Sequence, residues 1–272
     1  MKVCGKTDVG LRRHENQDTF AVEQGEKLLI AVVCDGMGGA EGGQIASSLA
    51  VETFMKEIRA LLRADMTAGQ LRELVAPEAG QGVLVVGLGN REITPDAIGP
   101  EAVKNLIVTR HLQAGPDEAL PGLMRVAACQ PGVLSQTGIE SLELVKCAMQ
   151  TAQPDVVIVI DALAAAEPGR LFRTVQLSDS GIVPGSGVGN SRQEFSRRTL
   201  GVPVIAVGVP TVVDAISLFR QAELELDVPR GVLVTMQDVD TRVREMGRLV
   251  GYSCDLALHR GLSLAEIPTF LS

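Results

Sequence analysis

Residues 154–165, PDVVIVIDALAA, decide the fold of this chain. Five consecutive β-branched residues lead directly to Asp161, with no alternation between apolar and polar positions. A strand of this composition is buried on both faces, which is typical of parallel sheets whose strands are joined by helices. Similar short apolar runs occur at 83–88 and 204–209. We therefore predict an α/β fold, with a parallel or mixed sheet and helices on both of its faces.

The segments between and after these strands have apolar residues at the spacing of an α-helix. Predicted helices cover residues 100–112, 139–152, a segment from about 211, 238–259 and 263–271. A glycine-rich segment at 180–190, SGIVPGSGVGN, is predicted to be a long loop. Because strand and helix alternate from residue 83 onwards, we assign 83–272 to one α/β domain.

The first part of the chain follows a different pattern. An apolar run at 28–34 stops at an Asp-Gly pair and predicts a buried strand that ends in a loop. Residues 41–64 have the spacing of one long amphipathic helix. A mixed stretch ending in PEAGQG follows this helix. We therefore divide the chain into a first segment at 1–70, a junction at 71–82 and the α/β domain.

The composition excludes several classes of protein. With 46% hydrophobic and 21% charged residues, the chain can bury a sizeable core. A net charge of −8 and only 3% aromatic residues argue against a partner that is a nucleic acid. Every apolar run is far shorter than the roughly 20 residues of a membrane span, so no membrane partner is expected. The absence of a signal peptide and the five scattered cysteines predict a cytoplasmic protein with reduced thiols.

Two carboxylates lie where open parallel sheets form their sites, beyond the carboxyl ends of the strands. Asp161 follows one apolar strand, and Asp96 lies in the loop after another, within ITPDAIGP. If the two strands are neighbours, both side chains enter one crevice, share a proton and differ in pKa. Such a pair can act as general acid and general base. It can also hold a divalent metal that activates water.

Each of these residues also has a purely structural interpretation. Asp96 fits the N-cap of a helix, because Thr-Pro-Asp is a common helix start. Asp161 fits an Asx turn at the end of a strand. The segment Gly87-Leu-Gly89 does not complete a dinucleotide-binding motif. The three histidines are interpreted as structural rather than catalytic: His14, His111 and His259.

The blocks VLVVGLGNREITPDAIGPEAVKNLIVTRHL, PGVLSQTGIES, PDVVIVIDALAA and RTVQLSDSGIVPGSGVGNSRQEFSRRTLGVPVIAVGVPTVVDA closely resemble the germination protease of spore-forming bacteria. The resemblance covers about residues 80–272. It implies an endopeptidase of the spore core that degrades small acid-soluble spore proteins during germination. It also implies a fold similar to hydrogenase-maturation proteases and a homotetramer.

The two proposed catalytic aspartates of that family match Asp96 and Asp161. Its chemistry is regarded as atypical aspartic-type, with a metal-assisted route also considered, and we assign no required cofactor. Two glycine-containing segments are candidate substrate-binding elements, because backbone N–H groups in such loops can polarise a carbonyl. Their residues are Gln136, Thr137, Gly138, Gly185, Gly187 and Asn190. The alternative is that these glycines serve tight turns that need a positive φ.

The first segment resembles the start of the bacterial PPM-type, metal-dependent Ser/Thr protein phosphatases. The resemblance lies in GKTDVGLRRHENQDTFAV and VVCDGMGGAEGGQIAS. It implies that Arg13 contacts phosphate and that Asp18, Asp35 and Gly36 organise Mn²⁺ or Mg²⁺. The fold implied is a partial α+β segment that precedes the α/β domain. The later acidic motifs of that family do not follow, so we predict no competent phosphatase site.

Three functions are therefore weighed. The leading hypothesis is an endopeptidase that uses the pair Asp96 and Asp161 on small acid-soluble spore proteins. The second is a PPM-type phosphatase, which requires Mn²⁺-dependent release of phosphate. The third is an inactive chimeric or truncated chain, because the resemblance to the protease omits its N-terminal part.

Overall fold

The computed structural model describes nine stretches of the chain: residue 7, then 16–24, 29–34, 43–76, 80–112, 122–189, 192–221, residue 229 and 231–271. The chain divides into two compact units, Met1–Arg63 and Ala64–Ser272. Each unit is described separately below. The helix α1 (Gly43–Val75) contributes residues to both units.

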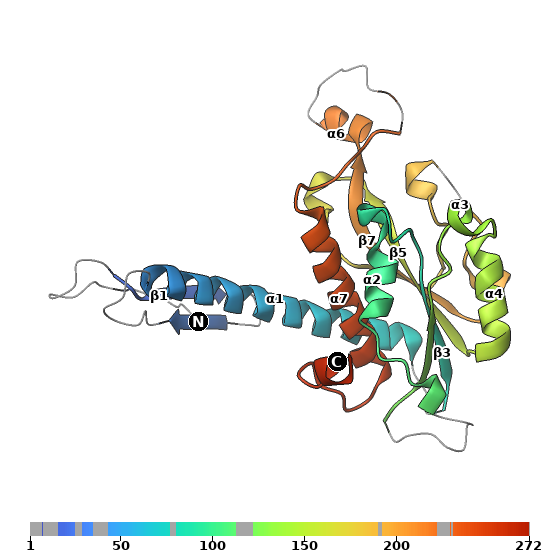
Figure 1. The fold of residues 1–272 in the computed structure, drawn as a ribbon, viewed down its shortest axis with the longest axis horizontal. Coiled ribbons are helices and arrows are strands. Elements are labelled where there is room, and N and C mark those ends of the chain that lie inside the picture. Colours follow the sequence, from blue (N-terminus) through green and yellow to red (C-terminus); the bar gives the residue numbers. More distant parts are fainter. Residues whose placement is uncertain are drawn as a thin grey trace. The chain divides into compact units, whose positions relative to one another are not determined.

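The second unit is built on a six-stranded sheet with the strand order β4-β3-β5-β7-β6, in which β8 also pairs with β7 (Figure 1). The four strands β4, β3, β5 and β7 are parallel to one another. The short strands β6 and β8 are antiparallel to β7. Their bounds are β3 (Gly82–Gly87), β4 (Arg125–Cys129), β5 (Val156–Ala165), β6 (Gln176–Ser178), β7 (Val204–Asp214) and β8 (Leu233–Val234). The predicted parallel or mixed sheet is therefore confirmed.

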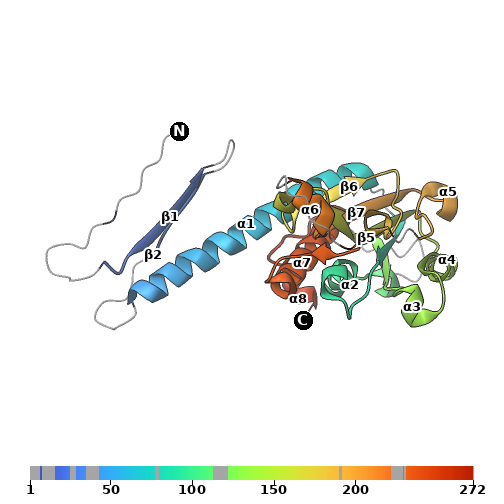
Figure 2. The same ribbon diagram turned by 90° about the horizontal axis from the view of Figure 1, so that it is seen from above.

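Successive residues of a strand point to opposite faces of the sheet, and both faces of this sheet are covered by helices. Val83 and Val85 belong to a core shared with α2 (Ile98–Lys104), α7 (Val239–Leu258) and α8 (Ile267–Leu271). Leu84 and Val86 belong to a second core, shared with α4 (Ser141–Ala152). Figure 1 shows α4 on the opposite side of the sheet from α2 and α7, and Figure 2 shows α2 beside α7. The fold class is thus an α/β sheet covered on two faces.

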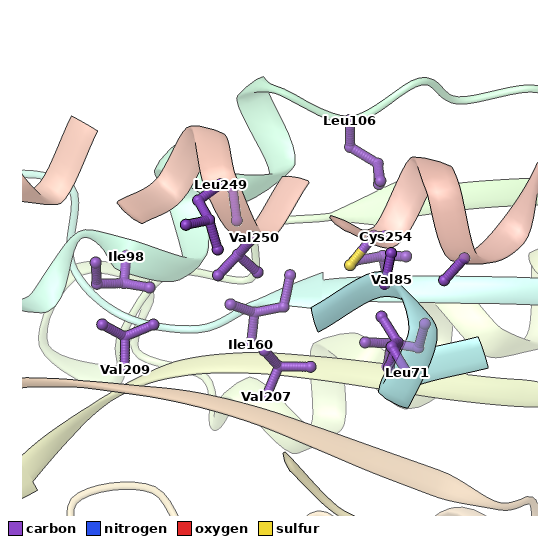
Figure 3. Close-up of a cluster of buried hydrophobic side chains, with 14 of the residues drawn as sticks. Leu71, Val85, Ile98, Leu106, Ile160, Val207, Val209, Leu249, Val250 and Cys254 are labelled. Atoms are coloured by element: carbon purple, nitrogen blue, oxygen red, sulfur yellow. The ribbon is translucent and has the colours of Figure 1, made fainter. Parts of the chain in front are cut away.

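The larger core joins strand and helix residues that are far apart in the sequence (Figure 3). Ile160 of β5 and Val207 of β7 lie under Val250 of α7. Leu71 of α1 is fully buried in the same cluster. Burial of a side chain of this size contributes about 1.5–3 kcal/mol to folding. The last turns of α1 are therefore part of the α/β unit.

The prediction that the helix from residue 41 ends near residue 64 was wrong, because α1 continues to Val75. Its buried residues Ala64, Ala68, Leu71 and Val75 recur every three or four positions and form one apolar stripe. The side chain of Arg72 donates hydrogen bonds to the backbone carbonyls of α7. Tertiary packing thus extends the helix through a stretch whose local sequence is mixed.

The strands β5 and β7 are longer than predicted. Pairing between them continues past Ile160 as far as Ala165 and Val213, with a register shift after Leu163. Asp161 consequently lies within a strand and not in a turn after it. The helix predicted from about 211 begins at Ala215 as α6 (Ala215–Gln221), because β7 extends to Asp214.

The helix predicted at 100–112 was also wrong in its length. It ends at Lys104, where the Asn105 side chain donates to the Glu101 carbonyl at 2.8 Å. A separate turn, η2 (Arg110–Leu112), follows. Between them the backbone N–H of Ile107 donates to the Asp255 carboxylate at 2.9 Å, which holds this stretch extended. The predicted helices 139–152 and 238–259 agree closely with α4 and α7, whereas only Ile267–Leu271 of the predicted helix 263–271 is helical.

In the first unit, β1 (Thr19–Gln24) pairs antiparallel with β2 (Leu29–Cys34), which confirms a strand at 28–34. The prediction that this strand is buried was wrong, because Val33 is 76% exposed and Ala31 is exposed as well. The hydroxyls of Thr19 and Ser47 lie 2.9 Å apart, and the Ser47 hydroxyl donates to the Gln17 carbonyl at 2.6 Å. These bonds connect the hairpin to the first turns of α1. They satisfy polar groups at the start of the helix.

Two further properties concern the described part of the chain only. None of its helices is both long and apolar enough to cross a membrane. The cysteines that lie within it are free thiols: Cys34, Cys129, Cys147 and Cys254. Burial raises the pKa of the Cys129 thiol to about 11, and burial and the charge of Asp255 raise the pKa of Cys254.

Candidate active site

The candidate site is built on the loop that follows β3. Leu88 still donates its backbone N–H to the Ile160 carbonyl at 2.8 Å, so this loop begins in contact with β5. The chain then turns at Gly89, whose φ is +112°. A β-carbon at this position would lie 1.9 Å from the backbone oxygen of Asp96. Only glycine therefore allows the short turn η1 (Thr94–Asp96) to lie against the end of the strands.

Asp96 is held in place by the start of its own loop. The backbone N–H of Asn90 donates to Asp96 Oδ2 at 2.7 Å. Burial raises the pKa of Asp96 above its ordinary value, while the bond from Asn90 opposes that shift. The structure shows no side-chain cap from Asp96 to a helix, so the N-cap interpretation of this residue was wrong.

Asp161 is the more deeply buried of the two acids, with 5% of its surface exposed. It lies within β5, opposite Gly208 of β7. Its Oδ1 accepts the backbone N–H of Ala162 at 2.9 Å. Burial, together with the negative charge of Asp96, raises the pKa of Asp161 to about 7. The two aspartates therefore lie close enough to interact, although 65 residues separate them in the sequence.

This arrangement allows the pair to keep one proton near neutral pH. A buried carboxyl beside a second negative charge resists ionisation, so the proton stays on Asp161 while Asp96 is free to ionise. One carboxylate and one carboxylic acid at the same site are the two groups that general acid–base hydrolysis needs. Each acid uses one oxygen for a backbone N–H, and among the described residues its second oxygen has no partner and is available for water or substrate.

One predicted substrate-binding segment touches the loop that carries Asp96. Gln136, in the short helix α3 (Leu134–Thr137), donates from Nε2 to Asn90 Oδ1 at 2.8 Å. The Thr137 hydroxyl instead lies 2.9 Å from the carbonyl of Ile139 and 3.2 Å from that of Val133, both in its own turn, and its single hydrogen bonds one of them. Gly138 ends α3 with a φ of +70°. The structure thus brings Gln136 to the loop that carries Asp96, and Gly138 has the positive φ of a helix C-cap.

The second predicted segment packs on the far end of β5. Gly185, with a φ of +73°, and Gly189, with a φ of +72°, flank the turn η5 (Ser186–Val188). A β-carbon on Gly187 would lie 3.0 Å from the β-carbon of Ala164, three residues beyond Asp161. The close approach of Ala164 explains why residue 187 is a glycine, and the positive φ explains why residue 185 is a glycine. Asn190 lies outside the described residues.

The sequence analysis did not single out Asn90. This residue is 8% exposed, and it connects Asp96 to Gln136 through its backbone N–H and its side-chain oxygen. The signal that could have found it is its position, because it lies in the loop after the strand β3, at the same sheet edge as the two acids.

The phosphatase-like residues fall mostly outside the described part of the chain. Arg13, Asp35 and Gly36 belong to stretches that the structure does not describe. Asp18 is described, and its backbone N–H donates to the Asn16 side chain at 3.1 Å. Among the described residues, no group of three or more histidine, cysteine, aspartate or glutamate side chains is placed to hold a metal ion. The phosphatase resemblance therefore stays a prediction.

Fold and site together define a class: an α/β protein with two interacting acids at the carboxyl edge of a parallel sheet, a site suited to hydrolysis. A comparison with known protein families shows to which family the chain belongs. Residues 54–224 match the family described as "Germination protease", and the chain belongs to the germination protease family. It is therefore related to peptidases. The matched region includes both Asp96 and Asp161.

Individual relatives agree with this assignment. The chain is 38% identical over 231 residues to a germination protease of Clostridium acetobutylicum, covering 72% of this chain and 71% of the relative. It is 55% identical over 136 residues to a germination protease of Bacillus subtilis, but this match covers 50% of the chain and 37% of that relative. A solved NiFe hydrogenase maturation protease, HycI from Thermococcus kodakarensis, covers 67% of this chain and 97% of its own length at 12% identity. The TM-score of this match is 0.36.

Proposed function

We propose that this chain is an endopeptidase that hydrolyses small acid-soluble spore proteins and that Asp96 and Asp161 are its catalytic acids. The observation that carries the proposal is the burial of Asp161 within β5, next to the loop that carries Asp96, at the edge of the sheet. These surroundings raise the pKa of Asp161 to about 7. Membership of the germination protease family supports a peptidase and a role in the spore. The substrate, a homotetrameric assembly and location in the spore core belong to the same proposal.

The two acids have different roles because their surroundings differ. Asp96, as the carboxylate, takes a proton from a water molecule, and the water oxygen adds to the carbonyl carbon of the scissile peptide bond. Asp161, which keeps its proton to about pH 7, donates it to the leaving nitrogen as the C–N bond breaks. The products are a carboxylic acid and an amine. The sheet edge holds both groups in fixed positions, which removes part of the entropic cost of the reaction.

A cleavage assay tests the proposal. The purified chain is incubated with an α/β-type small acid-soluble spore protein, beside Asp96→Asn, Asp161→Asn and the control Asp65→Asn, which changes an exposed acid on α1. We expect discrete products from the parent and the control, and a loss of at least about 100-fold in each pair variant. Full activity in Asp161→Asn, or no cleavage by the folded parent, would refute the proposal.

A second arm of the assay addresses the metal-assisted alternative. The acid pair as described acts on water directly, so cleavage should persist in EDTA. Loss of cleavage in EDTA, with recovery on adding Mn²⁺, would contradict this mechanism, because the pair would then serve as metal ligands. Light scattering coupled to size-exclusion chromatography measures the assembly, and a homotetramer is expected.

A further inference from the structure

The mechanism proposed above uses the two carboxyl groups but not the side-chain amide of Asn90, which is a further polar group at the site. Asn90 lies two residues after Leu88, whose backbone N–H bonds the carbonyl of Ile160, the residue that precedes Asp161. Its own backbone N–H bonds the carboxylate of Asp96 at 2.7 Å. Asn90 is thus attached to the segments that carry both acids, and 92% of its surface is buried, since 8% is exposed.

The orientation of this amide is determined by two donors. Asn90 Oδ1 accepts the backbone N–H of Glu92 at 2.9 Å and Nε2 of Gln136 at 2.8 Å. Only an oxygen can accept both bonds, so the opposite end of the amide is the nitrogen Nδ2. The donor from Glu92 is local, but Gln136 belongs to α3, 46 residues further along the chain. The bond from Glu92 by itself is sufficient for the turn of the loop, so the turn does not require the bond from Gln136.

The nitrogen Nδ2 of Asn90 has two N–H groups and no hydrogen-bond partner among the residues that the structure describes. Nδ2 is not among the fully buried side-chain atoms of the described residues that lack a hydrogen-bond partner, so it reaches the surface, where water or a ligand can accept its hydrogen bonds. An aspartate at this position would accept the same two bonds without leaving a donor unused. An amide donor that is held in one orientation and open to the surface, on the loop that carries Asp96, is suited to an acceptor on the substrate.

We propose that Asn90 Nδ2 donates a hydrogen bond to the carbonyl oxygen of the scissile peptide and stabilises the oxyanion of the tetrahedral intermediate. Gln136 is the positioning residue that holds the amide in this orientation. As the water oxygen bonds to the carbonyl carbon, the C=O electron pair moves to the oxygen, where the N–H of Asn90 meets the developing charge. When the C–N bond breaks, that electron pair re-forms the carbonyl. This inference rests on the proposed function.

Asn90→Asp is the first test, because it keeps the acceptor for Glu92 and Gln136 and removes the donor, while it also adds a negative charge. We expect its kcat on a peptide spanning the cleavage site to fall about 10²–10³-fold with KM changed less than about threefold. Thermal unfolding should show a folded protein. Asn90→Ser, which keeps an acceptor for the Glu92 N–H, is the second variant and should lose kcat to a similar extent. It also adds no charge.

Gln136→Met tests the positioning role, with Gln70→Met on the exposed face of α1 as its matched control. Losing one of the two donors to Asn90 Oδ1 should lower kcat about tenfold and leave KM nearly unchanged. The control should match the parent. Full activity in Gln136→Met would overturn the positioning role.

The outcomes separate this inference from the proposed function. If Asn90→Asp and Asn90→Ser keep the parental kcat while Asp161→Asn is inactive, the inference fails and the acid pair stands. If Asn90→Asp recovers full kcat at a shifted pH, its effect is that of an added charge, and the donor role is overturned. A rise in KM with kcat intact would assign Asn90 to substrate binding and also overturn it. If Asp161→Asn is active, the proposed function itself fails.

Discussion

Replacing Asp161 with asparagine should make the protein more stable at the same time as it removes activity. Burial and the charge of Asp96 raise the pKa of this carboxyl from 3.8 to about 7. The native protein therefore keeps a proton that the unfolded chain releases above about pH 4. The stability associated with this proton is fully present below pH 4 and is lost as the pH rises to about 7. About three pH units at ~1.4 kcal/mol each correspond to about 4 kcal/mol.

Asparagine does not titrate, and its Oδ1 can accept the same N–H of Ala162. The free energy of unfolding of Asp161→Asn should thus exceed that of the parent by a difference that grows from near zero at pH 4 to about 4 kcal/mol at pH 8. For a chain of this length that difference corresponds to roughly 10 °C in the melting temperature.

Urea unfolding of both proteins at pH 4, 6 and 8 measures this difference directly, and Asp65→Asn serves as the control for a surface acid. Other titrating groups are shared by parent and variant, so most of their contribution cancels. A difference that stays constant over this pH range would refute the reasoning, because it would show that Asp161 ionises normally in the native protein. A variant less stable than the parent at pH 8 would refute it as well.

Other predictions concern the surroundings of the site and the core. Asp255 is fully buried and its burial raises its pKa to about 8, so Asp255→Asn should raise stability by a few kcal/mol at pH 9 and little at pH 4, as pH-dependent urea unfolding would show. Gly89→Ala should displace the turn that carries Asp96, because of the 1.9 Å contact and the positive φ, and should lower both cleavage and the melting temperature. Leu71→Ala should cost about 2–5 kcal/mol, whereas Leu74→Ala, at a position 38% exposed, should cost under about 1 kcal/mol; equal effects would contradict the packing of α1 in the α/β unit.

The strands of the sheet could be predicted because burial on both faces leaves a clear signal. The apolar runs around Val85, Ile160 and Val207 have no alternation, and each is a central strand of the parallel sheet. Strands β4, β6 and β8 were not predicted. β4 is only partly buried, with an arginine at its start, and β8 has two residues, so neither carries that signal.

The lengths of the helices were less predictable because tertiary contacts decide where several of them end. The local sequence predicts that α1 ends near residue 64, but the packing of Leu71 and Val75 in the core extends the helix to Val75. The reverse holds after Lys104, where Asp255 of α7 binds the Ile107 backbone and favours an extended chain over a longer helix. Neither partner is adjacent in the sequence, so helical periodicity alone could not show these effects.

At the site, the sequence by itself proposed the pair Asp96 and Asp161, because both lie after apolar runs whose carboxyl ends meet at one edge of a parallel sheet and because both match the aspartates of the family it resembles. It did not show that Asp161 lies within β5, or that Asn90 and Gln136 join the site. Those features depend on strand pairing beyond Ile160 and on a hydrogen bond between residues 46 positions apart. The tertiary structure alone decided the protonation of the pair, since desolvation and the repulsion between charges depend on burial and distance in the folded chain.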